Sequence, residues 1–242
     1  IAADDGLVRA ISEGELSFTF EEGSHPAGLP TALGSFVVVE HPHDMAAVYS
    51  HLAPGSISSY LKTVKSDSIL GKTGSSGWTE GPGLLLQIFD RRLDQWVNPL
   101  LVLPPTVDTK PPVIKSMALV RGTKTYVLGD TASVPQGSYL ITADVADPAD
   151  SPWTAGPLAP LSIRLAVDGA EMAKEVFDVA EGKDGRLRLF SANPKDFAAY
   201  RTKDGRYALG ERLLSRGKVV FEVSAEDENG NRRTASWSVM VE

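Results

Sequence analysis

The fold of the first part of this chain is decided by the stretch Ser35-Phe36-Val37-Val38-Val39-Glu40-His41-Pro42-His43-Asp44. Residues 36–39 are continuously apolar and rich in β-branched side chains, which predicts a central strand of a sheet. A second strand is expected over 46–50, with Asp44 in the hairpin turn between the two strands. Tyr49-Ser50-His51-Leu52 ends this hairpin, and all four histidines of the chain lie at or before His51. Any histidine-based site must therefore be built on the first fifth of the chain.

Outside this hairpin, short runs of alternating polarity recur between turn residues such as glycine, proline, asparagine and aspartate. This pattern is typical of strands, and it predicts an all-β chain. In the first part of the chain the further strands are expected at 7–11, 16–20, 68–72 and 84–89. Residues 57–64 are the one segment there that is expected to be a short helix or irregular.

Two proline pairs, Pro104-Pro105 and Pro111-Pro112, mark the expected boundary between two domains. Proline pairs favour extended backbone, so residues 106–112 are predicted to be a semi-rigid linker after a first domain of residues 1–105. Beyond the linker, longer strands are expected at 113–120, 138–146, 161–167, 218–226 and 234–241.

The second domain, residues 113–242, is predicted to be an immunoglobulin-like β-sandwich. Asn229-Gly230 is a strong signal for the turn of a hairpin. Phe221 and Trp237 are expected in the core. An inserted hairpin region is expected near 178–216, with a short helix around 194–200.

Composition excludes several classes of function. The chain has 242 residues, a formal net charge of −7 and no run of five like charges, so a nucleic-acid partner is not expected. It has no cysteine, which excludes disulfides, thiolate zinc sites and a cysteine nucleophile. No apolar run approaches the roughly 18 residues of a transmembrane helix, so direct membrane insertion of this chain is not expected.

Read in order, the first 105 residues resemble the lysostaphin/LytM-type zinc metalloendopeptidases, which cut peptidoglycan peptides. The resemblance is carried by Ala3-Asp4-Asp5-Gly6-Leu7-Val8, Val37-Val38-Val39-Glu40-His41, Tyr49-Ser50-His51-Leu52, Leu70-Gly71-Lys72-Thr73-Gly74-Ser75-Ser76-Gly77, Gly81-Pro82 and Asn98-Pro99. It implies a small β-sheet domain with a groove and a metal at the floor of that groove. The fold class expected for the chain is therefore all-β, with a LytM-like groove domain followed by the sandwich.

The resemblance also implies which residues should carry the chemistry. In the family, zinc is held by an upstream H-x-x-x-D motif and by the second histidine of a late H-x-H motif. The first histidine of H-x-H and the histidine of Y-x-H-L assist the zinc-bound water. His51 matches the Y-x-H-L histidine, but the H-x-H positions are occupied by Gly83 and Leu85. The upstream motif would precede Ile1.

Because neither Gly83 nor Leu85 can bind a metal, the resemblance implies a degenerate, non-catalytic member in which His51, Gly83 and Leu85 are vestigial. Zinc or another cofactor is not expected. The expected role is to bind peptidoglycan, a cell-wall amidase or another envelope protein, and so to regulate or scaffold wall remodelling. The expected location is the periplasm or cell envelope, reached through an upstream export signal. The candidate binding residues are His41, His43, Tyr49, His51, Trp78 and Gln87.

Two alternatives remain open from the sequence. An active zinc peptidase could recruit His41, His43 or His51 as unconventional ligands, since His41 and His43 alternate at a strand end and would project to one face. The favoured interpretation of these two histidines is a hairpin shoulder on which both are solvated. A purely structural envelope protein could instead fill the groove with its own loop, residues 21–33. Exposed aromatic residues such as Trp78, Trp96 and Trp153 could stack on sugars, but of these only Trp78 is expected near the groove.

Two further patterns predict turns or loops instead of sites. The glycines of Gly71-x-x-Gly74-x-x-Gly77 lack the ending of a phosphate-binding loop and predict a tight turn with positive φ. Asp144, Asp147 and Asp150 lack the continuation of an EF-hand and predict a polar loop without calcium.

Overall fold

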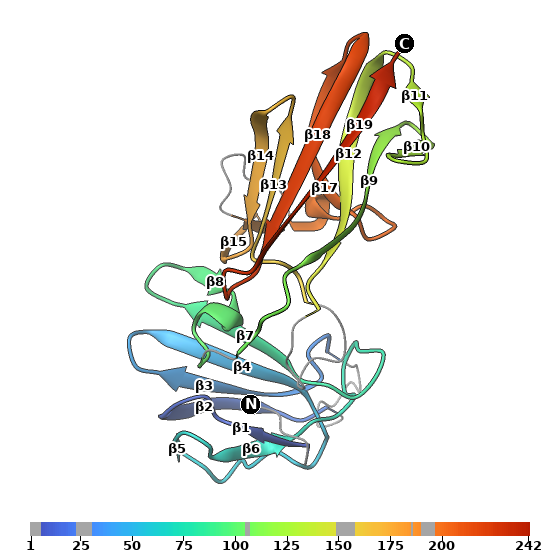
Figure 1. The fold of residues 1–242 in the computed structure, drawn as a ribbon. Coiled ribbons are helices and arrows are strands. Elements are labelled where there is room, and N and C mark those ends of the chain that lie inside the picture. The colour runs from blue at the N-terminus through green and yellow to red at the C-terminus, as the bar shows by residue number, and fades with distance from the viewer. Residues whose placement is uncertain (1–5, 23–30, 105–106, 149–157, 185, 190–196) are drawn as a thin grey trace. The chain divides into compact units, whose positions relative to one another are not determined.

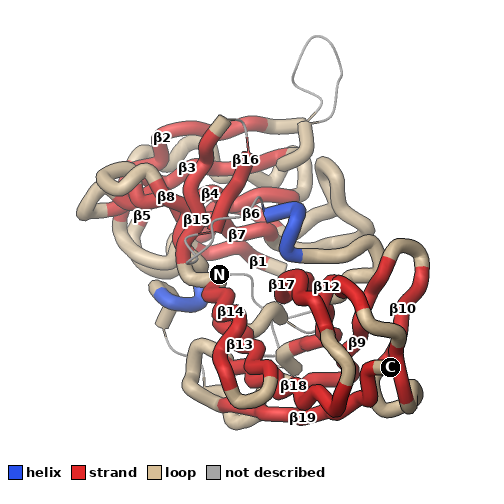
Figure 2. Tube along the Cα trace, turned by 90° about the horizontal axis from the view of Figure 1, so that it is seen from above, coloured by secondary structure: helices blue, strands red, loops and turns tan. Residues whose placement is uncertain are grey.

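A computed structural model describes residues 6–22, 31–104, 107–148, 158–184, 186–189 and 197–242. The chain divides into two compact units, Ile1–Pro104 and Pro105–Glu242 (Figure 1). This division falls within the first proline pair, beside the predicted linker. Strands make up most of both units, as Figure 2 shows, and the helices among the described residues are two short 3₁₀ turns. No helix among these residues is long and apolar enough to cross a membrane.

The first unit is built on one antiparallel sheet in the order β5-β2-β3-β4-β7-β8. Its strands are β2 (Gly14–Phe20), β3 (Ser35–His41), β4 (Met45–Leu52), β5 (Thr63–Val64), β7 (Leu85–Asp90) and β8 (Gln95–Val97). A separate antiparallel pair joins β1 (Leu7–Arg9) to β6 (Ile69–Lys72), and η1 (Pro99–Leu101) follows β8. As predicted, β3 is central, and Asp44 lies in the turn before β4. Residues 57–64 are irregular apart from β5.

The two faces of this sheet differ because successive side chains of a strand point to opposite sides. The inner face carries Val37, Val39, Ala47 and Tyr49, which pack with Val8 and Leu70 into the core of the unit. The opposite side of the sheet is called the outer face. Its residues are either directly opposite one another on neighbouring strands or two positions apart on the same strand. They are Phe18, Phe36, Val38, Val48, Ser50, Leu85 and Gln87.

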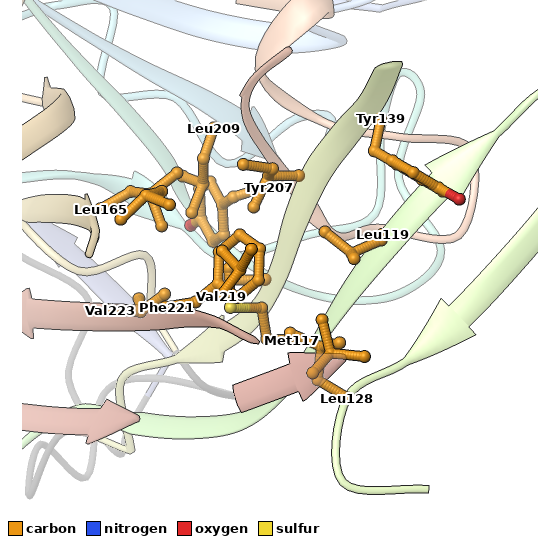
Figure 3. Close-up of a cluster of buried hydrophobic side chains, with 14 of the residues drawn as sticks. Met117, Leu119, Leu128, Tyr139, Leu165, Tyr207, Leu209, Val219, Phe221 and Val223 are labelled. Atoms are coloured by element: carbon orange, nitrogen blue, oxygen red, sulfur yellow. The ribbon is translucent and has the colours of Figure 1, made fainter. Parts of the chain in front are cut away.

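The second unit is a two-layer β-sandwich. One sheet has the order β10-β9-β12-β17 and the other β11-β19-β18-β13-β14. The strands are β9 (Val113–Arg121), β10 (Lys124–Val127), β11 (Ser133–Val134), β12 (Gly137–Ala146), β13 (Ser162–Val167), β14 (Ala170–Val176), β17 (Tyr207–Leu214), β18 (Gly217–Glu226) and β19 (Arg232–Val241). Both sheets contribute to one core, which Figure 3 shows around Met117, Leu165 and Phe221. The five strands predicted here are all present, and the finer immunoglobulin-like assignment stays a prediction.

The predicted insertion near 178–216 is only partly correct. It contains the expected hairpin, β15 (Val179–Lys183) with β16 (Arg186–Leu189), and the short helix is reduced to η2 (Phe197–Tyr200), with 194–196 outside the described residues. However, β17 pairs with β12 along the sandwich sheet and is not part of an insertion. Its alternation is interrupted by a bulge at Gly210, which is why the sequence pattern did not reveal the strand.

Candidate functional site

His51, the next-to-last residue of β4, has an unusual backbone conformation. Its φ is +64°, in the left-handed region that few residues with a Cβ occupy. The backbone there is held on both sides, because the His51 N–H donates to the Leu33 carbonyl at 3.0 Å and its own carbonyl accepts from the Gly74 N–H at 2.9 Å. Such conformations cost free energy and persist where the surroundings enforce them, which marks this strand end as a candidate functional position.

The His51 ring is held in one orientation by the segment that follows β6. Its Nδ1 lies 2.8 Å from the carbonyl oxygen of Ser76. A carbonyl can only accept, so Nδ1 carries the proton and Nε2 of the neutral ring carries the lone pair. Ser76 is itself buried and fixed, since its hydroxyl donates to the Leu52 carbonyl at 2.7 Å and accepts from the Ser35 N–H at 2.8 Å. His51 is therefore oriented as an acceptor or ligand through Nε2.

Gly83 is brought beside this network by a bridge between two backbones. Its N–H donates to the Gly74 carbonyl at 2.9 Å. A Cβ at Gly83 would have no neighbour within 4 Å, so the place of the first histidine of the H-x-H motif is open space. A Cβ at Gly74 would instead collide with the backbone of Ala53. Of the three glycines predicted to form a positive-φ turn, only Gly77 has positive φ, at +76°.

Leu85 occupies the second H-x-H position and lies opposite Ser50 in the β4–β7 ladder. Its side chain is 37% exposed and has no lone pair to offer a metal. Ser50 is completely buried, and its hydroxyl has no partner among the described residues. A catalytic zinc needs about three protein ligands. The only close group of three ligating side chains among the described residues lies in the other unit, so the described residues of the first unit do not fit zinc.

The alternative zinc site, which needs His41 and His43 on one face of a strand, is contradicted by the backbone. His43 lies in the hairpin turn with a φ of +66°, so the two residues do not alternate along one strand. His41 Nδ1 is 2.9 Å from both the Ser12 hydroxyl and the Glu13 carbonyl, and its buried Nε2 has no hydrogen-bond partner within the described part of the chain. His41 pairs with Met45, and the distance along β4 from 45 to 51 is about 20 Å. Neither histidine can therefore share a ligand with His51.

Of the other predicted binding residues, one is buried in the core and two are accessible. Tyr49 is fully buried on the inner face, where its hydroxyl accepts from the Ile11 N–H at 3.0 Å. Burial raises the pKa of Tyr49 to about 12. It is a core residue and not a binding residue. Trp78 is 76% exposed in the segment between Gly74 and Gly83, and Gln87 stands on the outer face opposite Val48.

The sequence reasoning missed the aromatic part of the outer face. Phe36 lies 5.7 Å from Phe18 and 5.6 Å from Phe20 between ring centroids, and Phe18 is 52% exposed. The signal was available, because alternation from the core residue Val37 puts Phe36 on the opposite side. The face therefore combines an apolar aromatic surface with the polar groups of His51 and Gln87 at one end. The loop predicted to fill it, 21–33, lies largely outside the described residues.

Comparison with known proteins gives a family for the first unit. Residues 1–99 match the model of the family described as Peptidase family M23, and residues 111–242 match a second family model. No curated protein matches the chain. Among solved structures, an NMR solution structure of lysostaphin aligns over 97% of this chain and 82% of its own, with 14% sequence identity and a TM-score of 0.32.

Proposed function

Starting from an N-terminal unit that belongs to peptidase family M23, we propose that this unit binds cell-wall peptidoglycan without cleaving it. The observation that carries the proposal is the pair Gly83 and Leu85 at the positions of the H-x-H motif. Removing both late histidines takes away one metal ligand and one group that assists water, whatever lies upstream of Ile1. A metal-activated water is the nucleophile of this chemistry, so hydrolysis is not expected.

Retention of binding is supported by what remains around the lost metal position. His51 keeps a fixed ring, and its Nε2 carries the lone pair that a ligand group could use. Trp78 and the exposed edge of Leu85 offer apolar contact. An extended peptide with small side chains and many amide groups, such as a wall stem peptide, matches these features.

A second ligand, a segment of a cell-wall hydrolase, is supported by one specific observation. The aromatic cluster of Phe18, Phe20 and Phe36 lies on β2 and β3, at the same end of the sheet as His51, because Phe36 falls between the pairs Ser35–Leu52 and Val37–Tyr49. Exposed apolar surface of this kind is typical of protein interfaces. In that case the unit would regulate wall remodelling by recruiting or activating the hydrolase. With either ligand the protein would work outside the cytoplasm, where its ligand is.

The test of the proposal measures cleavage and binding on the same full-length protein. We expect no release of dye from labelled peptidoglycan sacculi and no stoichiometric zinc in the purified protein, together with co-sedimentation of the protein with sacculi. Zinc at one per chain combined with cleavage would refute the non-catalytic proposal. If the protein did not co-sediment with sacculi but activated a purified wall amidase, the ligand would be the hydrolase and not peptidoglycan.

The role of His51 can be isolated with a matched pair of variants. His51→Asn removes the imidazole but keeps a residue that tolerates left-handed backbone. His43→Asn makes the same change at nearly the same φ, on an exposed histidine at the opposite end of the sheet. Loss of sacculus binding in the first variant and not in the second is expected. Equal binding by both would show that His51 does not contact the ligand.

A further inference from the structure

Three buried carboxylates meet at one end of the sandwich unit. Asp108 precedes β9, Asp147 directly follows β12, and Asp227 directly follows β18. Their exposed fractions are 8%, 0% and 1%, and each offers a carboxylate oxygen within 4.8 Å of the others. They meet because the end of β12 pairs with the start of β9, at Ala146 and Val113, and β18 of the facing sheet ends at the same level. The cluster thus unites residues that are up to 119 positions apart.

The turn between β18 and β19 holds the carboxylate of Asp227 and the backbone of Asp108 in place. Asp227 Oδ1 accepts from the N–H groups of Asn229 at 2.9 Å and Asn231 at 2.8 Å. The Asn231 side-chain amide donates to Asp227 Oδ2 at 2.9 Å and to the Asp108 backbone carbonyl at 3.0 Å. Asn231 therefore ties the segment before β9 to this turn. Asp227 Oδ2 accepts only one of these bonds and retains a lone pair for a further partner.

Asp147 is the carboxylate that the protein leaves unsatisfied. Its backbone is paired with that of Leu158, at 3.0 Å and 2.7 Å, so its position is fixed. Both of its side-chain oxygens are buried, and neither has a hydrogen-bond partner among the described residues. Burial and then the negative charges of Asp227, Glu228 and Asp108 raise the pKa of Asp147 to about 7. A buried carboxylate is normally paired or coordinates a metal, and the described residues offer Asp147 no hydrogen-bond or ion-pair partner.

We propose that Asp108, Asp147 and Asp227 form a binding site for a divalent cation, and that Ca²⁺ is the ion that fits best. All the side-chain donor atoms are hard carboxylate oxygens, which prefer hard cations such as Ca²⁺ and Mg²⁺ to softer metal ions. Ca²⁺ binds 6–8 oxygens at about 2.4 Å, so two of its ligands stand at most about 4.8 Å apart, as these oxygens do. It also tolerates irregular geometry and takes backbone carbonyls and water as further ligands, whereas Mg²⁺ requires a regular octahedron.

This site differs from the group of aspartates that is close in sequence. The sequence pattern of Asp144, Asp147 and Asp150 predicts a polar loop without calcium. The structure separates them, because Asp144 lies on β12 at 4.0 Å from the amine of Lys115, and Asp150 lies outside the described residues. The proposal departs from the expectation of no cofactor, and it does not depend on the proposed function of the first unit.

The test is a Ca²⁺ titration of the full chain, followed by calorimetry. Isothermal titration with CaCl₂ is expected to give one site per chain. Scanning calorimetry in about 5 mM CaCl₂, compared with EGTA, is expected to raise the Tm of the sandwich transition by roughly 5–10 °C, for a dissociation constant of about 0.1 mM. The same concentration of MgCl₂ is expected to give a smaller shift. Absence of a shift with Ca²⁺ and of saturable binding would overturn the proposal.

Asp147→Asn and Asp144→Asn provide a variant and its matched control. Both remove one negative charge from the same stretch of chain, but only the first removes it from the cluster. Asp147→Asn is expected to raise the Tm in EGTA, since it relieves repulsion, and to abolish the response to Ca²⁺. Asp144→Asn should keep the full response. A Ca²⁺ shift that survives in Asp147→Asn would overturn the assignment, and Asp108→Asn gives a second reading of the site if Asp147→Asn folds poorly.

Discussion

The buried phenol of Tyr49 should make the first unit sensitive to alkaline pH in a way that one substitution removes. Tyr49 is completely buried, and burial raises the pKa of its hydroxyl from 10.0 to about 12. Because the pKa is higher in the folded state than in the unfolded chain, the folded state binds the proton more tightly. The free energy of unfolding is therefore unaffected below about pH 10 and falls as the pH rises from 10 towards 12.

The loss in the free energy of unfolding can be calculated from the rise in the pKa of Tyr49. At pH 11 an unfolded tyrosine is mostly ionised and the folded one is mostly neutral, so ionisation lowers the free energy of unfolding by about 1.4 kcal/mol. Tyr49→Phe removes this dependence. It also leaves the Ile11 N–H without the acceptor 3.0 Å away, which costs about 1–2 kcal/mol at neutral pH.

Urea unfolding of the wild type and Tyr49→Phe at pH 8 and pH 11 measures both effects, and the comparison cancels ionisations that the two proteins share. The variant should be less stable at pH 8, and the gap should close by about 1.4 kcal/mol at pH 11. An unchanged gap would mean that Tyr49 ionises as freely in the folded state as in the unfolded chain. The assignment of Tyr49 to the core would then be wrong.

Three further substitutions test other parts of the structure. Gly74→Ala should destabilise the first unit by about 2 kcal/mol or more, because its Cβ meets the Ala53 backbone, while Gly83→Ala should change stability by less than about 0.5 kcal/mol; chemical denaturation of the pair checks this contrast. Asp227→Ala should lower the stability of the sandwich by about 2–4 kcal/mol, opposite in sign to Asp147→Asn without calcium, because it removes the acceptor of three hydrogen bonds; scanning calorimetry in EGTA distinguishes the two. Trp78→Ala should leave the Tm unchanged, since the side chain is 76% exposed, and should weaken co-sedimentation with sacculi; an unaltered sedimented fraction would remove Trp78 from the binding surface.

The sequence by itself determined those features that depend on short segments. Alternating and continuous apolar runs correctly predicted most strands. Successive side chains of a strand point to opposite faces, so a strand with one buried face has an apolar residue at every second position. The proline pairs marked the boundary region between the units. The absence of histidine after His51 established that the late H-x-H motif, with its one metal ligand and its one water-assisting histidine, is missing from the chain, and this requires no coordinates.

Only the tertiary structure decided which side chains share a place. His41 and His43 looked like neighbours on a strand, but positive φ at His43 put that residue in a turn. Tyr49 looked accessible within its motif, but its position in the β3–β4 register put it in the core. Asp108, Asp147 and Asp227 come from three distant segments, so no local pattern could join them. Register, backbone turns and packing between sheets are set by interactions across the whole domain, which is why the acidic cluster is visible only in the folded chain.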